Sequence, residues 1–545
     1  MHSNWLIPVM LLAPLVGALV LFILPRQAAA NLGGKLAFVF SLIPTLITVL
    51  LISRFNMAEG QAWQEMFRYN WIGQLGIHFT VGVDAMSLWL VALTVLITPV
   101  TMLDAMSKIK HRHNEFYAWM LLGYFAMLGI FVAQNVMLFY LFFEFSLIPT
   151  FFIIGIWGYS NRRKAAAKFF LYAFAGSIFI LASLLYLAWA HYEQAGSLSF
   201  GLKALYHTGQ SLPLEAQCFV FAGLLIGFAV KVPLFPLHTW MPLAITEAPS
   251  PGSVIIASFK IGAYGLLRFA LPMLPLAVVH FTPVVAVLAI ISILYGALIS
   301  WVQRDMKCLM AYAVISHLGL CVLAMFALTT SGLTGSIMVM INQGLAAGAL
   351  LLVMGMITQR YATRNLMDVS GLARRLPALG FFAGFFVIAT VAVPGLNGFI
   401  SEILSLVGTY VSGSPSHGGS LGPAYAIPAA LGMVVGALYM LYWIGKVFFG
   451  PLQEPAMDDE SGTPMPPKDL TMAEWTALVP LAAATLFLGL YPGPVLRSLE
   501  PAMNNIKQNV LANENAVPNA PAKAMASAMP VAAKSSLVLL ARSQK

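Results

Sequence analysis

Charged residues are scarce in this sequence. Only 9% of its 545 residues are Asp, Glu, Lys or Arg, whereas 60% are hydrophobic. Soluble domains carry about 25% charged residues, so the composition excludes a soluble globular protein and predicts an all-α polytopic protein of a lipid bilayer. The net charge of +9 does not indicate nucleic-acid binding, because the basic residues lie between apolar stretches, where they set the orientation of a membrane protein.

Cysteines and nucleotide-binding motifs are equally scarce. The three cysteines, Cys218, Cys308 and Cys321, lie in or beside apolar stretches and form no CxxC pair, which excludes an iron–sulfur or structural zinc site built from them. The ten histidines do not cluster, and no GxGxxG or Walker sequence is present. We therefore expect no cofactor and no metal on this chain, so that any redox chemistry coupled to it belongs to partner proteins.

What the sequence has in abundance is long apolar runs. A stretch of about 20 apolar residues is long enough to cross a bilayer as a helix. The first run is followed, not preceded, by basic residues, which disfavours a cleaved signal peptide. Fourteen such runs occur, at approximately residues 5–24, 36–53, 84–106, 115–134, 136–157, 168–190, 216–237, 251–271, 280–301, 308–329, 334–358, 379–408, 424–449 and 474–495.

Basic residues are distributed unevenly between the loops. Loops after odd-numbered runs hold 17 Lys and Arg residues, and loops after even-numbered runs hold only 4. This asymmetry predicts that the odd-numbered loops are cytoplasmic and that both termini lie on the opposite face. Residues 54–83 and 191–215 are expected to be polar loops on that outer face. The tail from about residue 500 is rich in Ala, Pro and Asn and is expected to be poorly ordered.

Two of the runs contain helix breaks. In the seventh run Lys231 is followed by Pro233 and Pro236, which remove backbone donors that lipid cannot replace. In the twelfth run the break is made by Pro394 and Gly395. Broken helices of this kind expose free carbonyl groups and leave room for water in transporters, so they indicate a path for a proton or another cation.

Five ionisable residues fall well inside apolar runs: Glu144, Lys231, Lys260, His317 and Glu402. A charge at the centre of a bilayer costs roughly 2.5–3.5 kcal/mol on insertion scales. Each residue alone could be a polar contact between helices, and Lys231 could be a snorkelling lysine at a helix end. Five together favour a translocation path. Glu144 is the candidate partner of Lys231, Lys260 and His317 would relay the proton, and Glu402 would stand at the exit.

The two broken runs stand five runs apart, which predicts an internal repeat. Runs 4–8 and 9–13 would form two five-helix units, and the second would be inverted relative to the first because five is an odd number. Asp84 and Asp305 lie near the ends of runs and are interpreted as structural. The predicted organisation is residues 1–113 for helices 1–3, 114–271 and 272–450 for the two units, 451–499 for a cytoplasmic loop and helix 14, and 500–545 for the tail.

Several longer motifs stand in a fixed order between residues 80 and 450. They are Val81–Leu88, Phe143–Pro149, Lys168–Ser177, Lys231–Trp240, Glu247–Pro249, Gly252–Val254, Gln303–Lys307 and Ser316–Gly319. In this order they resemble the antiporter-like subunits of respiratory complex I, the NADH:quinone oxidoreductase, and among these the M-type subunit, the counterpart of mitochondrial subunit 4. The resemblance implies a fourteen-helix fold with helices 7 and 12 broken and proton translocation along a central hydrophilic axis.

The resemblance also implies roles for the buried ionisable residues. It makes Glu144 and Lys231 a coupled pair. Lys260 and His317 become relay groups, and Glu402 becomes the terminal group. A glutamate at that last position is typical of the M-type, whereas L- and N-type subunits and multisubunit sodium/proton antiporters usually have lysine. The implied partners are the L- and N-type subunits in a bacterial inner membrane, with NADH, FMN, iron–sulfur clusters and quinone on other subunits.

Some positions depart from the family pattern. Leu243 and Ile245 stand where the family normally has Asp and His, and Gln343 replaces a family histidine in the eleventh run. A glutamine amide can hold a water molecule but cannot titrate, so a relay through this position must differ from that of the family. His238, Glu247 and Gln343 are accessory candidates.

Two other functions stay open. A subunit of a membrane-bound hydrogenase, a formate hydrogenlyase or a cation/proton antiporter would share most of these motifs, although Glu402 argues against the antiporter. A structural spacer that completes the membrane arm without conducting is slightly favoured by Gln343, Leu243 and Ile245. The retained Glu144, Lys231, Lys260 and Glu402 oppose it.

Overall fold

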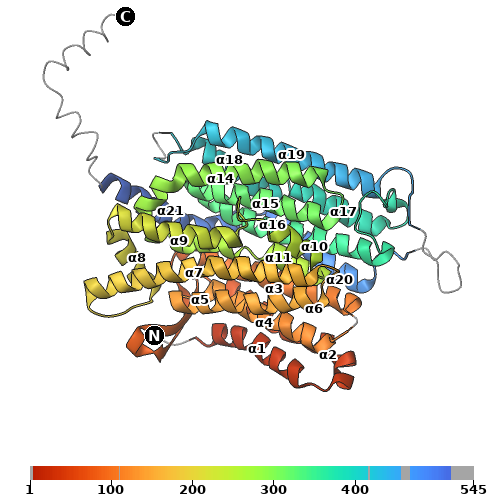
Figure 1. Ribbon diagram of the computed structural model, residues 1–545, viewed down its shortest axis with the longest axis horizontal. Coiled ribbons are helices and arrows are strands. Elements are labelled where there is room, and N and C mark those ends of the chain that lie inside the picture. The colour runs from red at the N-terminus through yellow and green to blue at the C-terminus, as the bar shows by residue number, and fades with distance from the viewer. Residues whose placement is uncertain (1–3, 110, 415–417, 456–466, 517–545) are drawn as a thin grey trace, which may run out of the picture.

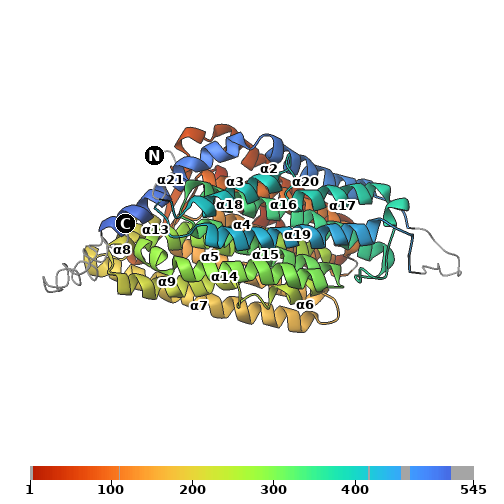
Figure 2. The same ribbon diagram turned by 90° about the horizontal axis from the view of Figure 1, so that it is seen from above.

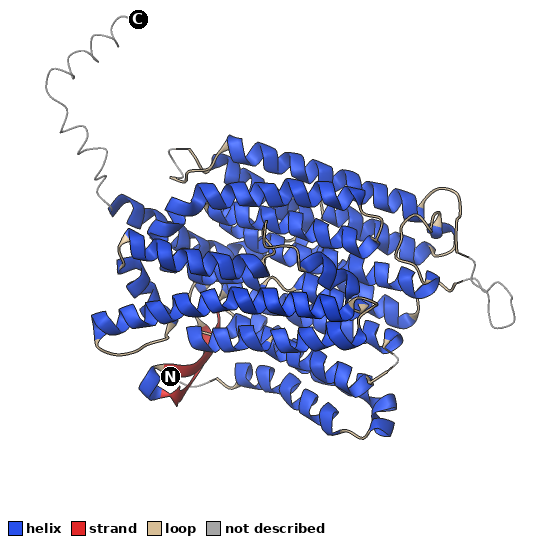
Figure 3. Cartoon of the chain, in the orientation of Figure 1, coloured by secondary structure: helices blue, strands red, loops and turns tan. Residues whose placement is uncertain are grey.

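The computed structural model describes residues 4–109, 111–414, 418–455 and 467–516. These residues form a bundle of helices that run roughly side by side, with a small β-hairpin at one end (Figures 1 and 3). In the view of Figure 2, α7 borders one side of the bundle, and α20 and α21 lie on the opposite side. We call the end of the bundle that carries Lys108, Arg162 and Arg364 the basic end.

The N-terminal part consists of three spans and the hairpin. Its elements are α1 (Leu6–Ile23), α2 (Arg26–Arg54), β1 (Gln64–Ile72), β2 (Ile77–Val83) and α3 (Ala85–Lys108), with short 3₁₀ turns at Met57–Glu59 and Gly73–Leu75. The strands pair antiparallel, Phe67 opposite Val81. Residues 64–83 are therefore not the simple polar loop that was expected.

The first five-helix unit is interrupted more often than the sequence predicts. Its elements are α4 (His113–Val132), α5 (Val136–Phe145), α6 (Leu147–Trp157), α7 (Arg162–Ala195), α8 (Leu202–Ser211), α9 (Leu214–Lys231), α10 (Met241–Glu247), α11 (Ser250–Ser258), α12 (Ile261–Gly265), a π-helical turn (Leu266–Ala270) and α13 (Leu271–Met273). The seventh span is broken between α9 and α10, as predicted. The eighth span is also broken, at Phe259 and Lys260, which was not predicted.

The second unit is more regular. It contains α14 (Pro275–Val302), α15 (Met306–Phe326), α16 (Thr330–Tyr361), a 3₁₀ turn (Leu372–Arg374), α17 (Pro377–Thr390), α18 (Asn397–Val411) and α19 (Pro423–Phe448). The twelfth span is broken between α17 and α18, as predicted. The two predicted breaks each fall in the fourth span of a unit, which agrees with the predicted repeat, whereas the exact division of the chain at residues 113, 271 and 450 stays a prediction.

The number of spans agrees with the sequence. In the described part of the chain, thirteen helical segments are long and apolar enough to cross a membrane, and the broken pair α17–α18 completes the fourteenth span. Nearly every residue of α15 and α16 is buried, whereas α1, α2, α7 and α19 expose large apolar side chains on the outside of the bundle. The protein is thus a multi-pass membrane protein whose most enclosed helices carry the candidate residues of the second unit.

The C-terminal prediction was partly wrong. After α20 (Met472–Leu490) the chain continues as α21 (Gly493–Ala516), so residues 500–516 are helical and not a poorly ordered tail. This helix packs on α3, α14 and α16. Ser498 Oγ accepts a hydrogen bond of 2.8 Å from the Trp89 indole, and Asn504 accepts one of 2.5 Å from Thr330. Residues 517–545 lie outside the described residues.

Polar caps fix several helix starts. Asp84 accepts a hydrogen bond from the Ser87 amide at the start of α3, and Asp305 accepts two from the amides of Lys307 and Cys308 at the start of α15. Side-chain acceptors at this position satisfy amides that have no partner within the helix. The structural interpretation of Asp84 and Asp305 is therefore confirmed.

Candidate functional site

At the break in the seventh span, side chains hydrogen bond to the free backbone groups. Helix α9 ends at Lys231, and the Val230 carbonyl accepts a hydrogen bond of 2.8 Å from the Trp240 indole beyond the break. The Phe235 amide donates to Ser292 Oγ of α14 at 2.9 Å. Non-helical backbone at membrane depth is tolerated where such partners replace the helical hydrogen bonds. The break is therefore a built feature at Pro233 and Pro236, and it leaves Lys231 at a helix end inside the bundle.

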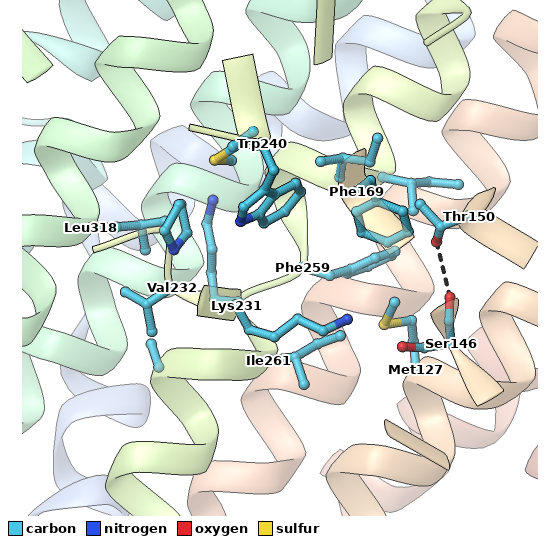
Figure 4. A pocket seen from close by; sticks show the side chains of 16 residues that line it. Met127, Ser146, Thr150, Phe169, Lys231, Val232, Trp240, Phe259, Ile261 and Leu318 are labelled. Atoms are coloured by element: carbon cyan, nitrogen blue, oxygen red, sulfur yellow. Dashed lines mark hydrogen bonds between the residues drawn. The ribbon is translucent and has the colours of Figure 1, made fainter. Parts of the chain in front are cut away.

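Lys231 is surrounded by aromatic rings. Its Nζ lies 4.9 Å from the ring centre of Phe143 and 5.6 Å from that of Phe169. In Figure 4 its side chain points toward Met127 and Ser146. Cation–π contacts of this kind stabilise a buried ammonium group in place of water.

Glu144 does not form the expected salt bridge. Among the described residues no ion pair joins Glu144 to Lys231 within 4.0 Å, and the Glu144 Oε1 atom is buried without a hydrogen-bond partner. Glu144 nevertheless follows directly after Phe143, whose ring centre lies 4.9 Å from the Lys231 ammonium. It stands at the end of α5, just before the interruption at Ser146 that separates α5 from α6. The structure thus places the two groups as neighbours.

A cavity lies between Lys231 and Lys260. Its volume is about 40 Å³, and a buried water needs roughly 10–15 Å³ in the same measure, so the cavity has room for water. Figure 4 shows the side chains that line it, which come from both units. The polar ones are Ser146, Thr150, Lys231, Trp240 and Lys260.

Lys260 occupies the unpredicted break of the eighth span. It is 4% exposed, stands immediately before α12, and donates a hydrogen bond to the Ala257 carbonyl at the end of α11. The break passes directly against the seventh span at Gly262. A Cβ atom there would come within 2.6 Å of the Val232 amide nitrogen and 2.7 Å of the Phe228 carbonyl oxygen. Glycine is therefore required for the close approach that brings both lysines to one cavity.

His317 and Glu402 meet in the second unit. His317 Nδ1 of α15 lies 3.5 Å from Glu402 Oε1 of α18, and their side chains are 5% and 12% exposed. Lys260 lines the same cavity as Leu318, the residue that follows His317. The structure thus brings His317 and Glu402, which are 85 residues apart in the sequence, together on the side of the bundle that Lys260 faces.

The break in the twelfth span is lined by amides. Gly395 has a φ of 95°, a conformation that glycine adopts without strain, and Asn397 opens α18 beyond it. Both amide atoms of Asn397 are buried without a partner. Asn342 Nδ2 of α16 donates to Ser401 Oγ at 3.4 Å, and the neighbouring Gln343 keeps its Nε2 buried and unpartnered. Unpaired buried amides of this kind commonly bind ordered water.

The other two accessory candidates lie at different depths. His238 is buried against the rings of Phe235 and Tyr295, with centre distances of 5.7 and 5.1 Å, and its Nδ1 has no partner. Glu247 lies at the basic end, where its Oε2 accepts a hydrogen bond of 2.8 Å from the Asn161 amide. Glu247 is therefore placed as a structural group away from the two lysines of the cavity.

Sequence reasoning missed two sets of buried charges. Lys307 and Arg268 were assigned to loops, yet Lys307 is fully buried and Arg268 is 6% exposed. Arg268 pairs with Asp84 through two hydrogen bonds of 2.6 and 2.7 Å. The signal that could have found both is their closeness to a predicted span boundary, since Lys307 lies one residue before the run at 308–329 and Arg268 lies three residues inside the end of the run at 251–271. Across the described residues, no group of three His, Cys, Asp or Glu side chains is placed to hold a metal ion.

Comparison with known proteins supports one family. The transmembrane family described as NADH:quinone oxidoreductase/Mrp antiporter matches residues 133–416. The chain is 35% identical to NADH-quinone oxidoreductase subunit M of Rhodobacter capsulatus, covering 92% of this chain and 96% of that one. It is 33% identical to the subunit M of Rickettsia typhi, covering 92% and 98%.

Solved structures agree with this likeness. A chain of respiratory complex I from Thermus thermophilus superposes with a TM-score of 0.81 at 28% identity, over 92% of this chain and 99% of that one. A chain of the Mrp complex from Dietzia shares the fold, with a TM-score of 0.79 at 18% identity, over 94% and 100%. With the two broken spans and the buried Lys–His–Glu series in place, these matches show that the chain belongs to the subunit M family of NADH:quinone oxidoreductase membrane subunits.

Proposed function

We propose that this chain is a proton-translocating membrane-arm subunit of a complex I-type NADH:quinone oxidoreductase. The observation that carries the proposal is the series Lys231, Lys260, His317 and Glu402, which runs through the enclosed centre of the bundle between its two broken spans. Intramembrane ionisable groups are costly, so a series of four marks an ion path more readily than a structural contact. Electron transfer elsewhere in the complex would drive the proton along it.

The path we propose starts at Glu144. Its carboxylate, whose Oε1 atom has no hydrogen-bond partner, can stabilise the Lys231 ammonium, and a change in their distance would let the amine release its proton. The cavity of about 40 Å³ connects Lys231 to Lys260 and has room for a water that carries the proton across. Lys260 would pass it toward His317, and His317 reaches Glu402 directly at 3.5 Å.

The surroundings of the subunit are part of the proposal. The chain would lie in a bacterial inner membrane with its odd-numbered loops in the cytoplasm and both termini outside, as the distribution of basic residues favours. Its partners would be the L- and N-type antiporter-like subunits. NADH, FMN, the iron–sulfur clusters and quinone would be bound by other subunits, because this chain supplies no motif for them.

A non-conducting spacer is the second candidate. It is favoured by the missing salt bridge between Glu144 and Lys231 and by Gln343, which cannot titrate. A subunit of a hydrogenase-type or antiporter complex is a third. The fold of the Mrp chain is compatible with it, but the fold alone does not choose between functions.

The test is proton pumping by inverted membrane vesicles that contain the assembled complex, with Glu144→Gln compared with the wild type. We expect pumping to collapse while assembly and the amount of complex stay unchanged. Glu193→Gln, at the exposed outer end of α7, is the matched control and should pump normally. Unchanged pumping by Glu144→Gln would favour the spacer. Sodium uptake in place of acidification would favour the antiporter.

A further inference from the structure

Lys307 is a fully buried lysine without a carboxylate partner. Its Nζ donates to the Ala248 carbonyl at 2.8 Å and to Ser253 Oγ at 3.1 Å. It also lies 4.9 Å from the ring centre of Tyr159. No described carboxylate approaches it within the 4.0 Å of an ion pair. A buried ammonium of this kind is costly, and an apolar side chain of similar length would fill the space without that cost. The charge therefore has a use beyond packing.

The groups that Lys307 binds belong to one turn. Ala248 joins α10, the second half of the broken seventh span, to α11, which leads to Lys260. The same turn is held from two other sides. Lys108, paired with Asp104 at 2.6 Å, donates to Ser250 Oγ at 3.2 Å.

The third tie comes from α16. Arg364 follows its C-terminal end, pairs with Asp305 at 3.2 Å and donates to the Thr246 carbonyl at 2.5 Å. The guanidinium also lies 4.7 Å from the ring centre of Tyr159, on which the Lys307 ammonium rests as well. We call Lys108, Lys307 and Arg364 with their acceptors the turn clamp.

The turn clamp lies at the base of two helices that carry relay groups. Helix α15 starts at Met306 and is continuous to His317, whereas α11 starts at Ser250 and leads to Lys260. His317 stands ten residues beyond Lys307 and Lys260 stands ten residues beyond Ser250. At 1.5 Å per residue, His317 lies about 15 Å from Lys307 within one helix, whereas α11 rises about 12 Å to Ser258 before the break that carries Lys260. Helix α10 contacts both α11 and α15, and α12 contacts α15 as well; Figure 1 shows α10 beside α11.

We propose that Lys307 is a positioning residue that sets the height of Lys260 relative to His317. It does so by tying the start of α15 to the α10–α11 turn, so that the two helices that lead to the relay groups stay in a fixed register at their base. Because α10 is also the second half of the broken seventh span, this turn joins that span directly to the helix that leads to Lys260. This inference rests on the proposed proton path.

The experiment compares Lys307→Met with the wild-type complex in inverted vesicles. Methionine keeps the volume and removes both hydrogen bonds. We expect protons pumped per electron to fall at least about tenfold, since a displacement of 1 Å between reacting groups can cost as much as 100-fold. The KM for quinone should stay unchanged if only the positioning is lost. A general folding defect would instead lower assembly and electron transfer together. Lys307→Arg, which keeps the charge and the donors, should restore more than half of the pumping.

Three further variants make the outcome decisive. Lys164→Met removes an exposed lysine at the same end of the bundle and should pump normally. Ser253→Ala removes one acceptor and should lower pumping about twofold by the same loss of positioning. If Lys307→Met fails to assemble, Ser253→Ala and Lys307→Arg give the answer.

The failure of the inference is distinct from that of the proposed function. Wild-type pumping by Lys307→Met, or a loss that Lys307→Arg does not restore, would overturn the inference. Lys260→Ala is the reference for the path itself. If it also pumps normally, the proposed function fails, whereas a loss in Lys260→Ala alone leaves the path in place and removes only the role of Lys307.

Discussion

The breaks in the seventh and twelfth spans differ in how their polar groups are satisfied. In the seventh span the break is closed, because Trp240 and Ser292 hydrogen bond to the free backbone groups and Lys231 faces aromatic rings. In the twelfth span the break is open, because the amide of Asn397 has no partner and Glu402 lies beside a titratable group of another helix. A repeated architecture therefore does not impose a repeated chemistry.

The difference between the two breaks gives the proposed proton path a direction. In the first unit the helix before the break ends at a cation, Lys231. In the second unit an anion, Glu402, follows the break. A proton that travels from the first break to the second therefore moves from an amine to a carboxylate. Lys260, at the junction of the units, contacts neither end of the path directly but shares a cavity with Lys231 and with Leu318, the residue that follows His317. The comparison predicts that each break can be disabled separately, with effects of different size.

The largest effect is expected at the closed break. Lys231→Ala removes the only amine that the cavity shares with Lys260, and loss of a positioned proton-transfer group typically costs about 100-fold or more. Pumping by the assembled complex in inverted vesicles measures this. Lys203→Ala, an exposed lysine of α8, is the control. Pumping by Lys231→Ala above a tenth of the wild-type rate would show that the closed break does not carry the proton.

The next largest effect is expected from a steric change at Gly262, where the spans of the two lysines pack together. Gly262→Ala forces a Cβ atom to within 2.6–2.8 Å of backbone atoms of Phe228, Lys231 and Val232, which cannot rotate away. Overpacking of this kind costs about 1–3 kcal/mol, measured as a lower thermal unfolding temperature of the purified complex. Gly384→Ala is the control, since its Cβ meets nothing within 4 Å, and it should be neutral or slightly stabilising. Equal unfolding temperatures for both variants would contradict the close packing described for the eighth span.

A smaller effect is expected at the open break. Glu402→Asp keeps the charge but withdraws the carboxylate by one methylene group, so the 3.5 Å contact with His317 is lost. We expect pumping to fall about fivefold, less than for a missing group, because a water can bridge the gap. Glu402→Gln, which keeps the length and removes the charge, should be the more severe of the two. If Glu402→Asp were the more severe variant, the distance to His317 would matter more than the charge of the carboxylate.

The smallest effect is expected from the cap of the closed break. Trp240→Phe keeps an aromatic ring but leaves the Val230 carbonyl without its donor. Hydrogen bonds between membrane helices average about 0.6 kcal/mol, so a slight decrease in thermal stability is expected and pumping should hardly change. Trp475→Phe, at a half-exposed indole of α20, is the control. A large loss of pumping in Trp240→Phe would mean that the break moves during turnover and needs this bond to close.

Most of the fold follows from the sequence because membrane spans are specified locally. Length and apolarity identify the runs, and Pro233, Pro236, Pro394 and Gly395 mark the breaks of the seventh and twelfth spans. The break at Lys260 was not predicted because no proline stands close to it. It depends on the fit of Gly262 against the backbone of α9, which is a contact between distant segments.

The candidate residues were found, but their pairing was not. Glu144, Lys231, Lys260, His317 and Glu402 stand out in the sequence as charges in apolar runs. That His317 pairs with Glu402, while Glu144 stays apart from Lys231, is decided by how α15, α18, α5 and α9 pack. Helix α21 was missed because its Ala- and Asn-rich composition is typical of disordered tails, and its stability comes from contacts with α3, α14 and α16.

The ion pair between Asp84 and Arg268 has a consequence for synthesis. The two residues are 184 positions apart, and both are buried in the finished bundle. At about 5–20 residues per second, Asp84 leaves the ribosome roughly 10–40 s before its partner. During that time the β-hairpin and the start of α3 must stay accessible to water, because a buried carboxylate without a partner would be costly. The arrival of the eighth span then fixes the end of the bundle that carries the hairpin, so that nascent chains truncated before Arg268 should leave the hairpin open to protease.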